Sequence, residues 1–334
     1  MIRWFQIVLK ELYINELSGK VILITGGTGF LGKSILDHLN TLNFTEAPTV
    51  ILTSRGFSQI NTGEWRNLKI RIIDSSIEDL SLKNIEPISL LIHAATSTNQ
   101  NESLNFNYLE KTIYQGTKHL LEECRINKPQ AFVYISSGAV YGKQSFPVLM
   151  EEASLLAPPI NDLTQAYGHF KRMAELLCHD FQKETGIPVS VARLFAFAGK
   201  RLDINGPFAI TNFIRNVINN EEIIIHGDGS ALRSYMNAKD LCHWLLTISS
   251  KNKSFDIINV GSDFQISILE LAELICKLTN RTFKTLNSNV DKNYYVPSIY
   301  KAKTKYGLNV NLDLENSITE MIFYQKNKRE GVSY

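Results

Sequence analysis

Short apolar runs alternate with stretches of helical periodicity between about residues 20 and 195. Each run is four to six residues long and almost free of polar positions, which is typical of strands buried on both faces of a parallel sheet. The predicted strands are Val21–Thr25, Val50–Thr53, Ile70–Ile73, Leu90–His93, Phe132–Ser136 and Val189–Leu194. The helices predicted between them include Lys33–Leu42, Tyr108–Arg125 and Gln165–Lys183. This alternation predicts an α/β fold with a doubly wound parallel sheet.

The pattern changes after residue 195, where loops are longer and strands shorter. The elements predicted there are helices near Ile210–Asn219, Asp240–Ile248 and Ser267–Leu278, and strands near Ile223–His226 and Ser234–Met236. They predict a smaller lobe at the carboxyl edge of the sheet, where ligands of such folds bind. We therefore divide the chain into an N-terminal helical extension (1–18), a sheet domain (19–195) and a lobe (196–334), part of which can return to the sheet.

The N-terminal segment is apolar, but Arg3, Gln6 and Lys10 interrupt it. Its apolar positions have helical spacing, so we expect an amphipathic helix over residues 2–16 that packs on the domain. The run is too short to span a bilayer, and a role at a membrane surface is disfavoured because its polar face is not rich in lysine and arginine.

Composition narrows the classes of function. The 334 residues, 44% of them hydrophobic, can form one large domain with a small lobe. A net charge of +2 and the absence of a long basic run argue against nucleic-acid binding. The four cysteines are widely spaced and form no C-x-x-C pair, so we expect free thiols in a reducing compartment, the cytoplasm, and no metal site.

A glycine-rich loop joins the first predicted strand to the first predicted helix. Gly26, Gly29 and Gly32 are spaced G-x-x-G-x-x-G, which allows a tight turn, a close approach to a pyrophosphate and close packing of helix on strand. An ordinary glycine-rich turn is the alternative, but the strand before and the helix after favour a Rossmann-type dinucleotide site. The residues expected to contact the dinucleotide here are Gly26, Thr28, Gly29, Phe30, Leu31 and Gly32.

The end of the second strand bears on which dinucleotide binds. An NAD site usually has an acidic residue there for the ribose 2′-hydroxyl, whereas this chain has Ser54 and Arg55. A guanidinium at this place suits the 2′-phosphate of NADP, so we expect NADP, with NAD as the alternative. The further residues expected at the cofactor are Asp74, Ser75, Ala94 and Ala95.

Tyr167 and Lys171 are four residues apart, which places both side chains on one face of a helix. A nearby positive charge favours the charged form of an acid, so Lys171 is expected to lower the pKa of the tyrosine. A phenol with a lowered pKa can exchange a proton with a sugar hydroxyl. An exposed aromatic–lysine pair is the alternative explanation of this spacing.

Several motifs in order resemble the extended short-chain dehydrogenase/reductase family, in its nucleotide-sugar epimerase, dehydratase and reductase branch. They span residues 25–32, 93–95, 136–142, 167–171, 193–195 and 227–240. The resemblance implies that Ser137 hydrogen-bonds the reacting sugar oxygen, that Tyr167 is the acid/base, and that Lys171 also holds the nicotinamide ribose. It further implies that Arg233 contacts the substrate's diphosphate, with Ser97 and Gly138 beside the substrate, and that the chain forms a homodimer through the predicted helices Tyr108–Arg125 and Gln165–Lys183.

The chain departs from the family pattern at Gly138 and Ala139, where the family's 4,6-dehydratases carry Asp and Glu. Removal of water needs an additional acid and base, so dehydration is disfavoured. The segment Asn293–Pro297 also replaces an Arg-Pro-Gly-Asp-like motif of the family, so its nucleotide pocket cannot be transferred. Together with Arg55, these features predict an NADP-dependent reductase of the 4-keto group of a nucleotide-linked 6-deoxy hexose. A nucleotide-sugar 4-epimerase is the alternative, and a dinucleotide-binding sensor or scaffold is the non-enzymatic one.

Overall fold

The computed structural model describes residues 13–55, 61–96, 104–286 and 293–330 of the chain. Its main body is a seven-stranded sheet in the order β10-β6-β5-β4-β1-β2-β3, in which every neighbouring pair is parallel. The strands are β1 (Val21–Thr25), β2 (Thr49–Ser54), β3 (Lys69–Asp74), β4 (Leu90–His93), β5 (Phe132–Ser137), β6 (Val189–Leu194) and β10 (Phe255–Val260). The predicted fold class, a Rossmann-type doubly wound parallel sheet, is confirmed.

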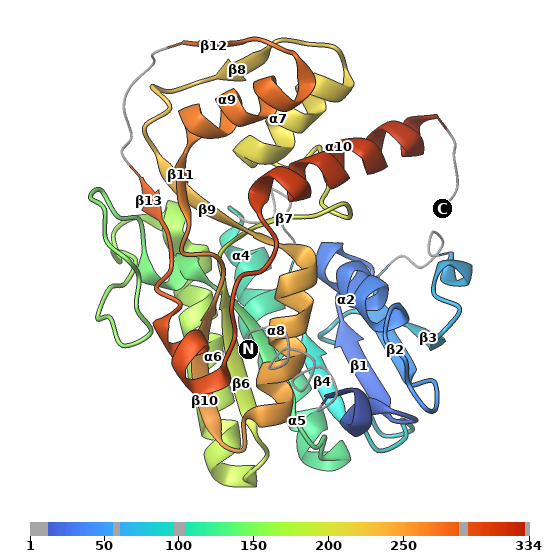
Figure 1. The fold of residues 1–334 in the computed structure, drawn as a ribbon. Coiled ribbons are helices and arrows are strands. Elements are labelled where there is room, and N and C mark those ends of the chain that lie inside the picture. Colours follow the sequence, from blue (N-terminus) through green and yellow to red (C-terminus); the bar gives the residue numbers. More distant parts are fainter. Residues whose placement is uncertain (1–12, 56–60, 97–103, 287–292, 331–334) are drawn as a thin grey trace.

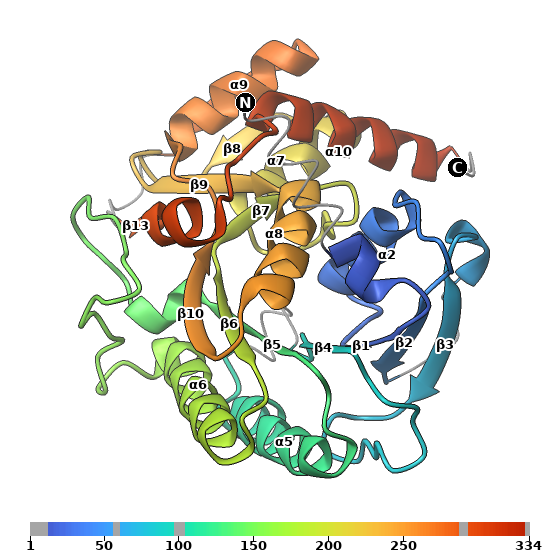
Figure 2. The same ribbon diagram turned by 60° about the horizontal axis from the view of Figure 1, so that its bottom comes forward.

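Helices cover both faces of this sheet because its central strands are apolar on both sides (Figure 2). Helices α2 (Phe30–Asn40) and α8 (Ala238–Lys251) pack on one face. Helices α5 (Gly116–Asn127) and α6 (Ala166–Thr185) pack on the other. The carboxyl ends of β1, β4, β5 and β6 thus meet at one edge, between the two helical layers.

The smaller lobe begins directly after β6, at that carboxyl edge (Figure 1). Its first sheet contains β7 (Ala196–Ala198), β9 (Leu232–Asn237), β11 (Gln265–Ser267) and β13 (Tyr294–Tyr295). Its second sheet pairs β8 (Ile223–Ile225) with β12 (Phe283–Thr285). Its helices are α7 (Ala209–Ile218), α9 (Ile268–Thr279) and α10 (Leu314–Arg329).

The chain returns from the lobe to the large sheet, through α8 and the edge strand β10, which pairs with β6. The return to the sheet agrees with the predicted division of the chain, but the sequence pattern indicated neither β10 nor α10. The apolar run of β10 is interrupted by Asp256, whose carboxylate accepts hydrogen bonds from Lys301, Lys305 and Tyr306. These partners come from a distant segment, so the local pattern concealed the strand.

The predicted helix Tyr108–Arg125 is longer and less regular than expected. It begins as α4 (Phe106–Leu109), where the Asn105 side chain accepts a hydrogen bond from the Tyr108 amide, and continues through a π-helical segment at Glu110–Gln115 into α5. A Cβ at Gly116 would lie 2.5 Å from Cγ2 of Ile77. The glycine therefore lets α5 approach the segment that follows β3.

Only part of the predicted N-terminal helix can be examined, because residues 2–12 lie outside the described residues. Residues 13–17 are helical, and Tyr13 is fully buried. Its hydroxyl lies 3.2 Å from Nε2 of His38 and 3.1 Å from Nδ1 of His243, which belong to α2 and α8. Within the described part of the chain, none of the helices is both long and apolar enough to cross a membrane.

Candidate active site

The glycine loop is a backbone cradle at the carboxyl end of β1. Gly26 has a φ of +66°, and a Cβ there would lie 2.8 Å from the Ala94 carbonyl oxygen and 2.9 Å from Cα of Ala95. At Gly32 a Cβ would lie 2.2 Å from the Gly27 carbonyl oxygen. Both positions therefore require glycine, because any side chain would push the loop away from its neighbours.

Helix α2 begins immediately after this loop, at Phe30, and its first residues include Leu31. Its N-cap is Gly29, which offers no side-chain hydrogen bond to the free N–H groups of the first turn. A helix N-terminus of this kind attracts anions, because those N–H groups and the helix dipole point toward the ligand. The loop and helix thus fit the pyrophosphate of a dinucleotide.

The adjoining strand ends form the side of the site expected to meet the adenosine. Oγ1 of Thr28 lies 2.6 Å from Oγ of Ser54, which ties the glycine loop to the end of β2. Arg55 donates a hydrogen bond of 3.2 Å to the Tyr108 hydroxyl. Asp74 is exposed at the end of β3 and is the register partner of Ser54.

The segments after β3 and β4 are held mainly through their backbones. The Ser75 amide donates to the Ser54 carbonyl, and the Ala94 and Ala95 amides donate to Oγ1 of Thr25 at 3.1 and 3.3 Å. The structure therefore brings all the predicted dinucleotide residues to one edge of the sheet.

Tyr167 and Lys171 lie in the first two turns of α6, and both face the sheet. Nζ of Lys171 donates to the Ile135 carbonyl at 2.8 Å and to Oγ1 of Thr96 at 3.0 Å. The same ammonium lies 5.7 Å from the centre of the Tyr167 ring. The predicted helical face is therefore confirmed, with the lysine anchored to the ends of β4 and β5.

The expected lowering of the tyrosine pKa is wrong for the structure described. Burial raises the pKa of Tyr167 above its ordinary value, with Tyr295 acting in the same direction and a hydrogen bond with Ser137 opposing them. Burial also lowers the pKa of Lys171 to about 7, although Glu175 opposes that change. Desolvation is the largest cause at both groups because both are buried, and burial disfavours the charged form of each.

Ser137 ends β5 and caps the short 3₁₀ turn Gly138–Tyr141, accepting a 3.1 Å hydrogen bond from the Ala139 amide. Its Oγ also lies 3.4 Å from the hydroxyl of Tyr295, a residue of the lobe. Ser137 also lies beside Tyr167, since its hydroxyl opposes the rise in the pKa of that phenol. The three hydroxyls thus meet although their residues lie far apart in the sequence.

The nearest carboxylate on α6 is already committed to other groups. Glu175 is buried and accepts a bidentate pair of hydrogen bonds from Arg193, at 3.0 and 2.7 Å, and one of 2.5 Å from Oγ of Ser136. Arg193 also donates to the Tyr141 hydroxyl at 2.9 Å. This network satisfies the carboxylate, so it holds β5, β6 and α6 together and supplies no free acid or base.

His93, at the end of β4, is a buried and neutral histidine next to the site. Nδ1 of His93 lies 2.7 Å from Oγ1 of Thr25, and its Nε2 lies 3.0 Å from Oγ1 of Thr117. Burial lowers the pKa of His93 to about 3, with Lys171 adding to the effect. The ring is therefore uncharged and serves as a structural link between β1, β4 and α5.

The lobe contributes Arg233, whose Nη1 donates to the carbonyls of Leu232 and Asn293, both at 2.8 Å. It is the register partner of Tyr295 in the parallel pair of β9 and β13. Arg233, which is predicted to bind the diphosphate, therefore pairs with the strand that carries the Tyr295 hydroxyl to Ser137. Of the other predicted substrate residues, Gly138 begins the turn after Ser137, and Ser97 lies outside the described residues.

Three site residues were not identified from the sequence. Glu175 could have been, since it continues the face of Tyr167 and Lys171 by one further turn. Thr96 directly follows the predicted Ala94 and Ala95 but carries no motif. Tyr295 lies in a segment that was noted only as a departure from the family, and nothing local shows that it reaches β5.

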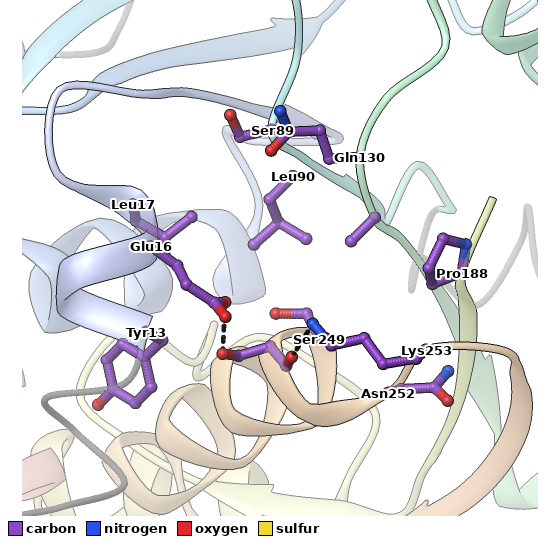
Figure 3. Close-up of a pocket in the computed structure, with 12 residues that line it drawn as sticks. Tyr13, Glu16, Leu17, Ser89, Leu90, Gln130, Pro188, Ser249, Asn252 and Lys253 are labelled. Atoms are coloured by element: carbon purple, nitrogen blue, oxygen red, sulfur yellow. Dashed lines mark hydrogen bonds between the residues drawn. The ribbon is translucent and has the colours of Figure 1, made fainter.

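A separate cavity of about 230 Å³ lies at the opposite end of the sheet (Figure 3). Its lining includes Ser89, Gln130 and Pro188, which lie one or two residues before β4, β5 and β6. The Ser250 hydroxyl donates a hydrogen bond to the carboxylate of Glu16, which is labelled in the figure. This cavity shares no residue with the predicted dinucleotide or sugar site.

A model of the NAD dependent epimerase/dehydratase family matches residues 22–261. The chain belongs to this family. The predicted resemblance and the enzymatic nature of the chain are confirmed, since the matched residues include the glycine loop, Ser137, Tyr167 and Lys171.

Relatives in this family carry names for more than one reaction. The chain is 27% identical over 327 residues to UDP-glucuronic acid decarboxylase 1 of Xenopus tropicalis, which covers 95% of this chain and 75% of that protein. It is 29% identical over 269 residues to the putative UDP-glucose 4-epimerase of Methanocaldococcus jannaschii, covering 76% and 81%. The solved UDP-glucuronic acid 4-epimerase of Bacillus cereus, in complex with NAD, matches with a TM-score of 0.79 at 23% identity, covering 94% and 98%. The structural match shows a shared fold, and the names leave the individual reaction open.

Proposed function

We propose that the chain reduces the 4-keto group of a nucleotide-linked 6-deoxy hexose and uses NADP as its dinucleotide. The observation that carries this proposal is a reacting centre made of hydroxyls and one ammonium, without a free carboxylate among the described residues around it. Arg55, next to the end of β2, supports NADP because no acidic residue stands there to meet a 2′-hydroxyl.

The residues of the site have distinct tasks in this reaction. Tyr167 donates the proton to the carbonyl oxygen, and its raised pKa keeps it protonated until that oxygen gains negative charge. Ser137 hydrogen-bonds the same oxygen and stabilises the charge that develops on it. Lys171 holds the nicotinamide ribose. When bound, the dinucleotide supplies the hydride for the sugar carbon.

The lobe binds the rest of the substrate in this proposal. Arg233 is directed by two carbonyls and carries a fixed charge suited to a diphosphate. Elimination of water from the sugar is disfavoured, because Gly138 and Ala139 carry no acid or base and the carboxylate of Glu175 is bound to Arg193.

A 4-epimerase is the second candidate, and the name of the Methanocaldococcus jannaschii relative favours it. An epimerase regenerates its dinucleotide in each cycle, whereas a reductase consumes NADPH in proportion to product. The same Tyr167 and Ser137 would serve both reactions, so the two candidates are separated by stoichiometry.

One assay compares the two candidates directly. Purified protein is incubated with UDP- or dTDP-linked 4-keto-6-deoxyglucose and NADPH, and absorbance at 340 nm is followed alongside the product mass. A reductase consumes one NADPH per sugar and yields a product two mass units heavier. In parallel, UDP-glucose and UDP-glucuronic acid are incubated without added dinucleotide, where conversion to the C4 epimer would contradict the reductase. Dinucleotide binding without turnover in either arm would favour the sensor or scaffold.

We also propose that the chain forms a homodimer through α5 and α6, which lie side by side on the outer face of the sheet domain (Figure 2). The exposed apolar side chains there are Ile126, Met173 and Leu176, with exposed fractions of 58%, 47% and 65%. Light scattering after size exclusion should give twice the 37.8 kDa of the chain, and Leu176→Glu should give the monomer. A cytoplasmic location fits the four buried free cysteines and remains part of this proposal.

A further inference from the structure

The segment that contains β13 enters the reacting centre from the lobe. The Tyr294 amide donates a 2.9 Å hydrogen bond to the Gln144 carbonyl, and the two residues form an isolated antiparallel β-bridge. Two residues later, the Val296 carbonyl accepts a 3.1 Å hydrogen bond from the Met150 amide. Pairing with β9 on the other side fixes the segment laterally. The backbone around Tyr295 is therefore held from two directions.

The side chain of Tyr295 is aimed at the end of β5. Its ring lies on Phe195, with 4.8 Å between the ring centres. Its hydroxyl lies 3.4 Å from the Leu194 carbonyl, to which it donates, and 3.4 Å from Oγ of Ser137. The same proton can instead be donated to Oγ of Ser137, because either hydroxyl can be the donor in that contact.

Gly138 is matched to this tyrosine. A Cβ at residue 138 would lie 2.7 Å from the Tyr295 hydroxyl and 2.8 Å from Cε1 of Phe195. The space beside Ser137 that a side chain at 138 would occupy is thus filled by a phenol from the lobe. Tyr295 can occupy this position only because residue 138 has no side chain.

We propose that Tyr295 is a positioning residue for Ser137, which holds the serine Oγ by donating its phenol proton to it, with the Leu194 carbonyl as the alternative acceptor. This inference rests on the proposed function in assigning Ser137 to the reacting oxygen. Held in this way, Ser137 accepts hydrogen bonds from Tyr295 and from the Ala139 amide, and its own proton is left for the reacting oxygen. The lobe that binds the nucleotide thereby also orders the catalytic serine, because Arg233 and Tyr295 are register partners.

The kinetic test compares Tyr295→Phe with Tyr294→Phe, the neighbouring phenol that faces away from Ser137 in the alternation of the strand. Removal of the Tyr295 hydroxyl should lower kcat about five- to ten-fold, the value of one hydrogen bond, with KM and dinucleotide affinity within about two-fold of wild type. Tyr294→Phe should leave all three constants unchanged. An unchanged kcat in Tyr295→Phe would overturn the proposal.

A double-variant cycle shows whether Tyr295 acts through the serine. In a Ser137→Ala background, Tyr295→Phe should cost less than about two-fold, because the group that it positions is gone. A full five- to ten-fold loss in that background would mean that the phenol acts on the substrate directly, which contradicts the positioning role.

Crystal structures of the wild type and of Tyr295→Phe test the inference without any turnover. The wild type should show one Ser137 rotamer, with Oγ within hydrogen-bond distance of the Tyr295 hydroxyl, and the variant should show a different or mixed rotamer. An identical single rotamer in both proteins would refute the inference. Since this result does not depend on the substrate, a failed 4-keto sugar assay with a shifted rotamer would remove the proposed function and retain the role of Tyr295.

Discussion

The dinucleotide half and the sugar half of the site are built by different means. The first is made of backbone, and Gly26 and Gly32 have no space for a Cβ because other backbone atoms lie where it would stand. The second is made of side-chain hydroxyls, contributed by Ser137, Tyr167 and Tyr295 from a strand, a helix and the lobe. A backbone site tolerates most side chains around it but few changes of shape. A hydroxyl site depends on single atoms and on how they are oriented.

The largest effect is expected from removing one atom in the sugar half. Tyr167→Phe should lower kcat by about 10²–10⁴-fold, the usual contribution of a general acid, while dinucleotide affinity stays unchanged. Steady-state kinetics and a fluorescence titration with the dinucleotide measure the two quantities. Tyr300→Phe, at an exposed tyrosine, is the control and should match wild type. A parallel loss of dinucleotide affinity in Tyr167→Phe would mean that the halves are not separate.

A change of shape in the dinucleotide half should have the next largest effect. Gly26→Ala adds left-handed strain of about 1–2 kcal/mol and a clash with Ala94 and Ala95 that costs about 1–3 kcal/mol. Dinucleotide affinity should fall by about 100-fold or more, as the loop shifts to relieve the clash.

Gly186→Ala is the matched control for that variant. Gly186 has a φ of +72° and nothing within 4 Å of the added Cβ, so it introduces strain without a clash. It should lower the melting temperature but leave dinucleotide affinity intact. Equal affinities of Gly26→Ala and wild type would show that the loop does not form the predicted cradle.

Lys171 stands between the two halves, and its burial should make stability depend on pH. Its folded pKa is about 7, below its unfolded value, so the unfolded chain binds more protons between pH 7 and about pH 10. The free-energy cost of burying the charged lysine is therefore largest below pH 7, and it falls as pH rises from 7 to about 10. Lys171→Met should remove this contribution, which we place at about 1–4 kcal/mol.

Denaturant unfolding at pH 6, 7, 8 and 9 measures this effect through the difference between the variant and wild type. The variant also loses hydrogen bonds to Thr96 and the Ile135 carbonyl, but that loss is independent of pH. The wild type should therefore gain stability relative to the variant as pH rises. A difference that stays constant would contradict the lowered pKa.

The smallest effect is expected at the rim of the dinucleotide half. Arg55→Ala should weaken NADP binding about ten-fold, the value of a charge-assisted contact with a phosphate, and leave NAD binding unchanged. Titration of both dinucleotides provides the test. Arg71→Ala, on the neighbouring strand and paired with Glu86, is the control. Equal affinities for NAD and NADP that do not change in Arg55→Ala would remove the preference for NADP.

The dinucleotide half could largely be predicted from the sequence. Its glycine loop is continuous, and the strand before it and the helix after it carry their own periodic patterns. The large sheet was predictable for the same reason, except β10, where Asp256 depends on Lys301 and Lys305 for its burial. The Tyr167–Lys171 face was also predictable, since helical geometry alone brings both residues together.

The sugar half depended on the tertiary structure. The sequence determined that this chain has a dinucleotide loop, a tyrosine–lysine face and no carboxylate at residues 138 and 139, because each is a local matter of spacing or residue type. Only the folded chain decided that the pKa of Tyr167 is raised and that Tyr295 fills the space beside Ser137. Desolvation and contact between distant segments depend on what surrounds a group, and those surroundings come from strands and a lobe that meet only when the chain is folded.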